Sequence, residues 1–263
     1  SRNDRGIEMS DIEIQRKVLE RIGRAMGTFS MLRSGDRVAV GVSGGKDSLC
    51  LVHALSAYRR RAPFPFEIVA VTLEQGKFTS PIEKLKEPFE RLGIEWVLRD
   101  EARTLALVED GVVHGCDVCS RNRRSALYKV ASELNCTVLA LGHTADDCAE
   151  ALLRNILFNG RIAALPAVAE SQKGSMRVIR PLVYVSEELT RKYVEQDDLV
   201  GIGCVCGEKD GPRRDIRAFL QKMTENYTDV PDSVTAALAN VNPYSLFDSK
   251  LLKDGADISP AFV

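Results

Sequence analysis

Short apolar runs alternate with stretches of helical repeat along most of this chain. The apolar runs are of strand length and lie at residues 37–42, 66–73, 95–98, 137–141 and 177–182. Between them, apolar residues recur three and four positions apart, which is typical of helices that bury one face. Strands that alternate with helices imply parallel crossovers. The pattern therefore predicts an α/β fold with a doubly wound, parallel, five-stranded sheet.

Helices are also predicted on both sides of this region. Residues 12–29 carry one apolar stripe and should lie against the domain, and residues 213–227 form a basic helix. Residues 162–175 are small and polar and predict a loop, which is expected to lie over the functional site. The expected division is an N-terminal helical segment at 1–30, the α/β domain at 31–200 and a C-terminal helical extension at 201–263. Within the domain, helices are expected at residues 47–55, 81–92, 120–134, 151–159 and 187–196.

Composition narrows the class of protein without naming its activity. The chain has 263 residues and a formal charge of −1, so nucleic acid would have to be bound by local basic patches. No stretch approaches the roughly 20 apolar residues of a membrane span, and the first residues lack the apolar core of a signal peptide. We therefore expect a cytoplasmic protein without a membrane partner. Its seven cysteines, an odd number, favour metal-binding or catalytic thiols over a disulfide framework.

The first strand leads into a glycine pair that predicts an anion site. Glycines let the backbone approach a ligand closely, and the first turn of the following helix presents free N–H groups. The spacing fits neither the Walker A pattern nor a dinucleotide fingerprint. We expect a phosphate cradle made of Ser43, Gly44, Gly45, Lys46, Asp47 and Ser48.

A second polar group leaves the sheet at the same edge. The fourth strand leads into Gly142 and His143, followed by Asp146 and Asp147, and the second strand ends near Thr72. Ligands of doubly wound sheets bind beyond the carboxyl ends of the strands. A helix N-cap would explain one of the two aspartates and leave the other unexplained. Beside a nucleotide triphosphate, the pair is predicted to hold Mg²⁺.

Four cysteines occur in two close pairs. Cys116 and Cys119 lie just ahead of a predicted helix, and Cys204 and Cys206 flank one valine late in the chain. A structural zinc ion, a redox pair and an iron-sulfur cluster all use such spacings, and zinc would normally need four protein ligands. The remaining cysteines lie on or next to predicted helices and strands and are expected to be buried apolar residues: Cys50, Cys136 and Cys148.

Five motifs occur in one order: the glycine loop, Cys-x-x-Cys-Ser-Arg, Gly-His-x-x-Asp-Asp, Val-Ile-Arg-Pro-Leu, and a late Cys-Gly before a basic helix. Together they resemble the tRNA 2-thiocytidine synthetases and related iron-sulfur tRNA thiolases of the ATP pyrophosphatase (PP-loop) superfamily, over residues 12–248. The resemblance implies a PP-loop fold of the adenine nucleotide α-hydrolase type, an ATP site, and a 4Fe-4S cluster held by three cysteines. It also implies tRNA as substrate and a cysteine desulfurase or inorganic sulfide as sulfur donor, and it leaves a homodimer open.

The family roles carry over residue by residue. Cys116 and Cys119 would bind the cluster, with Cys206 rather than Cys204 as third ligand, because Cys206 keeps the Cys-Gly step and the spacing to Arg214. The late motif is C-x-C where the family usually has C-x-x-C. Catalysis would fall to Lys46, Asp47, Asp146 and Asp147, the last two binding Mg²⁺. ATP would contact Ser43, Gly44, Gly45, Lys46, Asp47, Ser48, Thr72, Gly142 and His143.

Arginines supply the local positive charge that tRNA binding would need. Phosphate contacts are expected from Arg121, Arg123, Arg124, Arg214 and Arg217, with Arg213 in the same run. The triplet at residues 59–61 ends a predicted helix, where cations suit the helix dipole. It is therefore either a solvated cap or the border of the same tRNA-binding face.

The chemistry implied by the resemblance is the adenylation of C2 of a tRNA pyrimidine, expected to be cytidine, followed by replacement of its oxygen with sulfur. Thr144 stands where the thiocytidine enzymes usually have a second histidine, which leaves the base and the tRNA position open. Two alternatives remain: an amidating or lysine-adding ligase of the same superfamily with a four-cysteine zinc site, and a nucleotide-sensing module without turnover.

Overall fold

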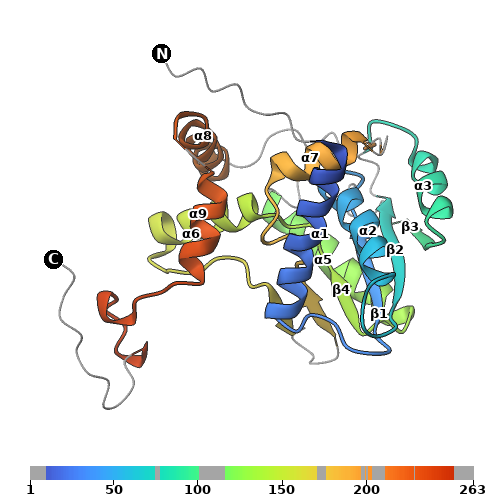
Figure 1. Cartoon of the computed structure of the whole chain (residues 1–263), viewed down its shortest axis with the longest axis horizontal. Helices are drawn as coiled ribbons and strands as arrows, with labels where there is room; N and C mark the ends of the chain where they lie inside the picture. The colour runs from blue at the N-terminus through green and yellow to red at the C-terminus, as the bar shows by residue number, and fades with distance from the viewer. Residues whose placement is uncertain are drawn as a thin grey trace.

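The computed structural model describes residues 10–74, 78–100, 116–170, 176–196, 199, 201–202, 211–227 and 229–251. Its centre is a six-stranded sheet with the order β3-β2-β1-β4-β6-β5 (Figure 1). All neighbouring strands are parallel except β5 and β6. The strands are β1 (Arg37–Val42), β2 (Glu67–Glu74), β3 (Glu95–Asp100), β4 (Val138–Ala140), β5 (Val168–Glu170) and β6 (Arg177–Ile179).

The doubly wound topology is confirmed, with one strand more than expected. The additional strand, β5, lies inside the segment 162–175 that was predicted to be a loop, and it pairs antiparallel with β6 at the edge of the sheet. Three residues are too few to show an alternating pattern. Pairing with β6, rather than local preference, makes this segment a strand.

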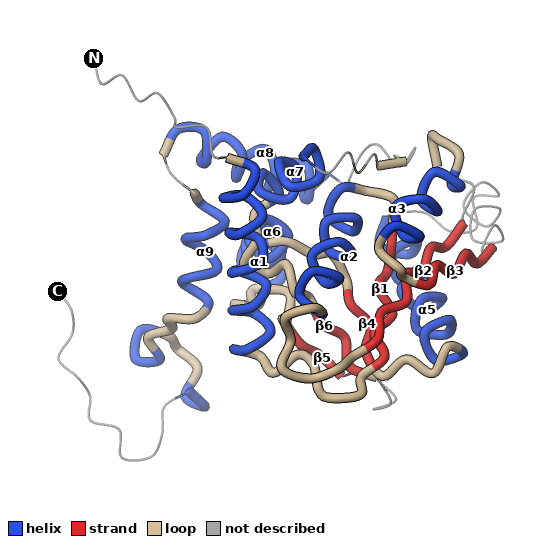
Figure 2. The backbone as a smooth tube through the Cα atoms, turned by 45° about the vertical axis from the view of Figure 1, so that its right-hand side comes forward, coloured by secondary structure: helices blue, strands red, loops and turns tan. Residues whose placement is uncertain are grey.

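Helices cover both faces of the sheet (Figure 2). They are α1 (Asp11–Thr28), α2 (Lys46–Arg59), α3 (Lys86–Arg91), α5 (Cys116–Glu133), α6 (Ala145–Asn159), α7 (Glu187–Gln196), α8 (Gly211–Asn226) and α9 (Val230–Leu238). Short 3₁₀ turns lie at η1 (Ile82–Leu85), η2 (Pro243–Ser245) and η3 (Ser249–Leu251). The predicted helix at 81–92 is thus a 3₁₀ turn followed by α3. The helix predicted at 120–134 begins earlier, at Cys116.

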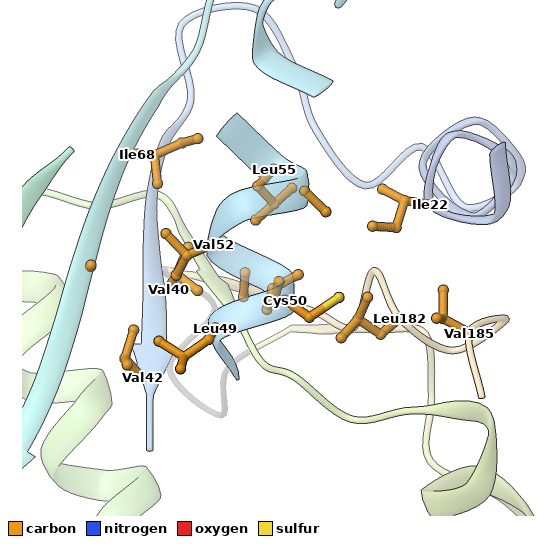
Figure 3. Close-up of a cluster of buried hydrophobic side chains, with 14 of the residues drawn as sticks. Ile22, Val40, Val42, Leu49, Cys50, Val52, Leu55, Ile68, Leu182 and Val185 are labelled. Carbon is orange, nitrogen blue, oxygen red and sulfur yellow. The ribbon is translucent and has the colours of Figure 1, made fainter. Parts of the chain in front are cut away.

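Alternate residues of β1 supply two separate cores. Val38, Val40 and Val42 face α1, α2 and α7, whereas Ala39 faces α5. Figure 3 shows the first of these cores, in which Cys50 of α2 lies among aliphatic side chains. A strand covered on both faces reads as a continuous apolar run, which is why β1 is evident in the sequence.

The terminal helices pack onto the same body. α1 buries its predicted stripe against α2 and α7, and Arg21 on α1 forms a two-pronged ion pair with Asp232 on α9. Ile216 and Leu220 of α8 form a small cluster with Ala149 of α6. The division into segments at residues 30 and 200 stays a prediction. Among the described helices, none has the length and apolar character needed to cross a membrane.

Candidate active site

The loop between β1 and α2 is a cradle of backbone groups. Gly44 has a φ of +77°, and a Cβ there would lie 2.4 Å from Cγ1 of Ile202, so both conformation and space require glycine. Ser48 closes the loop, because its Oγ donates to the Gly45 carbonyl at 2.8 Å and accepts from the Ser43 N–H at 3.2 Å. Gly45 is the N-cap of α2 and has no side chain to accept from the first N–H groups. These groups are available to an anion.

The exit of β4 touches this loop. A Cβ on Gly142 would lie 3.2 Å from backbone atoms of Asp47 and Ser48. β1 and β4 are neighbours in the sheet although two strands and several helices separate them in the chain. The strand that follows β1 in the chain lies on one side of this pair and the strand that pairs with β4 beyond it, β6, lies on the other, so the strand order reverses here. Doubly wound folds bind ligands at such a reversal. The structure thus confirms that the glycine loop and the Gly142 segment meet at one edge.

His143 lies at this edge as a neutral imidazole. Its Nδ1 is buried and has no hydrogen-bond partner in the described part of the chain. Burial lowers the pKa of His143 to about 4, opposed by the charge of Asp147 and assisted by the charges of Arg180 and Arg124. At neutral pH this ring can exchange hydrogen bonds with a ligand without carrying a charge.

The two aspartates of α6 each hold the N-terminus of a helix. Asp147 forms a capping box with Thr144, whose N–H donates to Asp147 Oδ2 at 3.0 Å. Asp146 reaches across to α7, where its Oδ2 accepts from the Glu187 N–H at 2.6 Å. Burial raises the pKa of Asp146 to about 6. Helix-end contacts therefore account for both carboxylates, where the sequence argument left one unexplained.

Lys46 lies between two carboxylates. Its Nζ is 2.9 Å from Oδ2 of Asp47 and 3.3 Å from Oε2 of Glu187. Asp47 also accepts from the hydroxyl of Thr190, one turn into α7. Burial opposes the charge on Lys46, but the two carboxylates outweigh burial and raise the pKa of Lys46. Burial also raises the pKa of Asp47, against the effect of Lys46.

The ion pairs continue from Lys46 to α8. Arg217 pairs with Oε1 of Glu187 and lies 3.9 Å from Oε2 of Glu150, a buried residue of α6. Arg213 places its Nε 2.7 Å from Oε1 of Glu150. Burial alone would raise the pKa of Glu187, but Lys46 and Arg217 bring it below its ordinary value. A chain of alternating charges thus joins the glycine loop to α7, α6 and α8.

Sequence reasoning missed three members of this network: Glu187, Thr190 and Glu150. Glu187 could have been found, because it is an acidic residue at the start of a helix that follows a predicted strand. The same pattern had identified Asp146 as a candidate. Thr190 and Glu150 gave no signal, because their partners lie far away in sequence. Only the folded chain brings them together.

The late segment of the chain lies against the loop. The Ile202 N–H donates to the Gly44 carbonyl at 3.0 Å, and the Ile202 carbonyl accepts from Thr79 Oγ1 at 3.0 Å. Cys204 and Cys206 follow in sequence and lie outside the described residues. The segment that leads to them therefore starts beside the phosphate cradle.

The first cysteine pair is described only by its backbone. Cys116 and Cys119 form the first turn of α5, and their side chains lie outside the description. Among the described residues, no group of three His, Cys, Asp or Glu side chains converges as a metal site. The remaining cysteines are buried, which confirms their assignment to the core: Cys50, Cys136 and Cys148.

The arginines expected to bind RNA have different surroundings. Arg123 and Arg124 of α5 are exposed, as is Arg214 of α8, whereas Arg217 is engaged with Glu187. The side chain of Arg121 lies outside the description. Exposed guanidinium groups are available to phosphates, whereas Arg217 already has a carboxylate partner. The contact of these arginines with tRNA stays a prediction.

The arginine triplet at 59–61 lies elsewhere. α2 has 14 residues and is therefore roughly 20 Å long. Its first turn lies at the carboxyl edge of the sheet, so its last residue, Arg59, lies at the opposite edge. The triplet is therefore remote from the phosphate loop, which favours the solvated helix cap, and its contact with tRNA stays a prediction.

Thr72 is buried within β2. Its Oγ1 accepts from Nε1 of Trp96 at 2.9 Å. This bond orients the hydroxyl toward β3, so the contact of Thr72 with a nucleotide stays a prediction.

Comparisons with known proteins agree with this geometry. Residues 12–200 match the family model of the PP-loop domain. A tRNA-cytidine(32) 2-sulfurtransferase of Aromatoleum aromaticum is 38% identical over 245 residues, which cover 91% of this chain and 77% of that protein. A tRNA-cytidine(32) 2-sulfurtransferase of Pelobacter propionicus is 37% identical over 250 residues, which cover 93% of this chain and 93% of that protein.

A solved structure shows the same fold. The U34-tRNA thiolase NcsA from Methanococcus maripaludis, solved with its [4Fe-4S] cluster, has a TM-score of 0.72 at 23% identity, covering 89% of this chain and 80% of that one. The sequence identity to the sulfurtransferases is higher than the identity to this structure and extends over most of the chain. The chain therefore belongs to the tRNA-cytidine(32) 2-sulfurtransferase family of PP-loop enzymes.

Proposed function

We propose that this enzyme uses ATP to activate C2 of a tRNA cytidine, position 32 being the site in the names of its relatives, and replaces the C2 oxygen with sulfur. The observation that carries the proposal is the uncapped start of α2 beside the exit of β4. A cradle of this kind suits the phosphates of a nucleotide.

In the first step the C2 oxygen attacks the α-phosphorus of ATP and pyrophosphate leaves. The N–H groups at the start of α2 bind the phosphates, and Lys46 neutralises charge that develops on them. Neutral His143 provides a hydrogen bond at the same edge without adding charge. In the second step sulfide attacks C2, and AMP leaves with the oxygen.

Mg²⁺ is proposed to bind the phosphates from the side of Asp146 and Asp147. Carboxylates suit this hard cation, which usually keeps several water ligands and binds few protein oxygens. The contacts with helix ends use Oδ2 of each residue, so Oδ1 of each remains as the donor atom for the ion.

The cluster is proposed to be held by Cys116, Cys119 and Cys206. The hydrogen bond between Ile202 and Gly44 supports a ligand from the late cysteine pair, because it holds the chain beside the cradle shortly before that pair. Cys206 is preferred to Cys204 for its Cys-Gly step and its spacing to Arg214. With three protein ligands, a bound 4Fe-4S cluster would supply one iron open to sulfide. The sulfur donor, a homodimeric assembly and a cytoplasmic location stay predictions.

One experiment tests the reaction and its cofactor together. The anaerobically purified protein, incubated with ATP, sulfide and tRNA, should form 2-thiocytidine detectable by nucleoside mass spectrometry, and it should contain iron. Cys206→Ala should lose iron and activity, whereas Cys204→Ala should keep both. A colourless, zinc-containing protein that also loses its metal in Cys204→Ala would favour the ligase with a structural zinc site.

A further inference from the structure

Glu187 connects two parts of the molecule that have separate tasks in the proposed reaction. Its backbone N–H is held by Asp146, and its two side-chain oxygens point to different cations. Oε2 faces Lys46 on the phosphate loop, and Oε1 faces Arg217 on α8. A residue held at its backbone and divided between two cations can exchange one for the other without moving its helix.

In the described part of the chain, equal numbers of cations and carboxylates take part in the ion pairs that run through Glu187. Lys46, Arg217 and Arg213 alternate with Asp47, Glu187 and Glu150, three cations against three carboxylates. Lys46 is therefore already neutralised by protein carboxylates. When phosphates approach, they must compete with Asp47 and Glu187 for this ammonium.

Each carboxylate has a second partner from a different element. Asp47 keeps the hydroxyl of Thr190, and Glu187 keeps Arg217. Without Arg217, a largely buried Glu187 would lose its remaining counter-charge once Lys46 turned to the phosphates. An unpaired buried carboxylate is unfavourable and would also repel a triphosphate.

We propose that Glu187 positions Lys46 for the phosphates of ATP, and that Arg217 takes over the charge of Glu187 when ATP binds. Tight binding of phosphates at the loop between β1 and α2 would then require α8, which contributes Arg217 and acts on the loop through Glu187. This inference rests on the proposed use of ATP. It makes Glu187 and Arg217 positioning residues, since they act through Lys46.

The test measures binding of Mg-ATP to the full-length protein without tRNA. Arg217→Gln should weaken binding by about tenfold, because truncating one partner of this partly buried ion pair leaves the other charge uncompensated. Glu187→Gln should bind Mg-ATP at least as tightly as the wild type, but its kcat should fall because Lys46 is no longer positioned. The double variant should recover the binding that Arg217→Gln loses.

Matched controls lie on α7. Arg191→Gln and Glu188→Gln make the same charge changes in exposed pairs, Arg191 with Glu195 and Glu188 with Lys192, and should leave the Kd for Mg-ATP unchanged. Normal binding by Arg217→Gln, or no recovery in the double variant, would overturn the inference. If the wild type itself bound no Mg-ATP, the proposed function would fail instead, so the two failures are distinguishable.

Discussion

The parallel strands begin at one rim of the sheet, here called the amino edge, and end at the opposite rim, the carboxyl edge. The two rims use the same ionic groups in different ways. At the amino edge, the buried carboxylate of Asp36 accepts from the Arg33 N–H at 2.6 Å and from Thr137 Oγ1 at 2.8 Å, and it pairs with Nη2 of Arg177. Both of its oxygens have fixed partners, and the cluster joins the starts of β1, β4 and β6. At the carboxyl edge, Lys46 and its carboxylates have alternative partners.

The difference shows that ion pairs can either stabilise the fold or remain exchangeable for a ligand. The pair of Asp36 with Arg177 is buried, and breaking a buried ion pair is costly, so the amino edge acts as a clamp. The carboxyl edge combines exchangeable pairs with helix N–H groups that no side chain caps and a His143 nitrogen that has no partner among the described residues. Groups of that kind are ready to bind a charged ligand.

The largest effect is expected from the exchangeable edge. Lys46→Ala should lower kcat for tRNA thiolation by roughly 10³-fold, because it removes charge stabilisation where the phosphates react. The melting temperature and iron content should stay near those of the wild type, as measured by calorimetry and metal analysis. A variant that turned over normally would remove the loop from the active site.

The clamp should show the reverse pattern. Asp36→Ala leaves Arg177 without its buried partner and should lower the free energy of unfolding by about 3 kcal/mol, measured by denaturant titration. The kcat of the folded fraction should be unchanged. Glu67→Gln, which alters an exposed pair with Arg37 at the same edge, should cost less than about 1 kcal/mol and serves as the control.

Acid should act on the carboxyl edge through His143. Its pKa is about 4 in the folded protein and about 6.5 when unfolded, so the unfolded chain binds more protons between these values. Stability should therefore fall by about 3 kcal/mol as the pH drops from 6.5 to 4. His143→Gln should flatten this part of the stability profile. An unchanged profile would place the titrating group elsewhere.

The smallest effect concerns the rim of the carboxyl edge. Replacing Arg123 and Arg124 together by glutamine should flatten the plot of log K for tRNA against log salt by roughly two units. The matched double replacement of Arg59 and Arg60, at the amino edge, should leave that slope unchanged. Equal slopes for all three proteins would remove α5 from the tRNA-binding face.

Local signals were sufficient for most elements. β1 and β2 are buried on both faces and are visible as apolar runs. The helix predicted to end at residue 159 does end there, before Gly160, whose φ is +58°. β5 was missed, because its pairing with β6 decides its conformation. The start of α5 was placed too late. The pair Cys116 and Cys119 was interpreted as a metal-binding or redox motif ahead of the helix, although both residues belong to its first turn.

The sequence alone determined the order along the chain of every strand except β5, the glycine loop and the family, because these depend on residues close together in the chain. Tertiary structure decided which charges meet. Glu187 and Thr190 meet Lys46 and Asp47, respectively, from a helix more than 140 positions further along. Arg59 lies at the far edge because α2 is long enough to span the sheet. Side-chain pairing across such separations depends on how helices pack, and no local pattern records it.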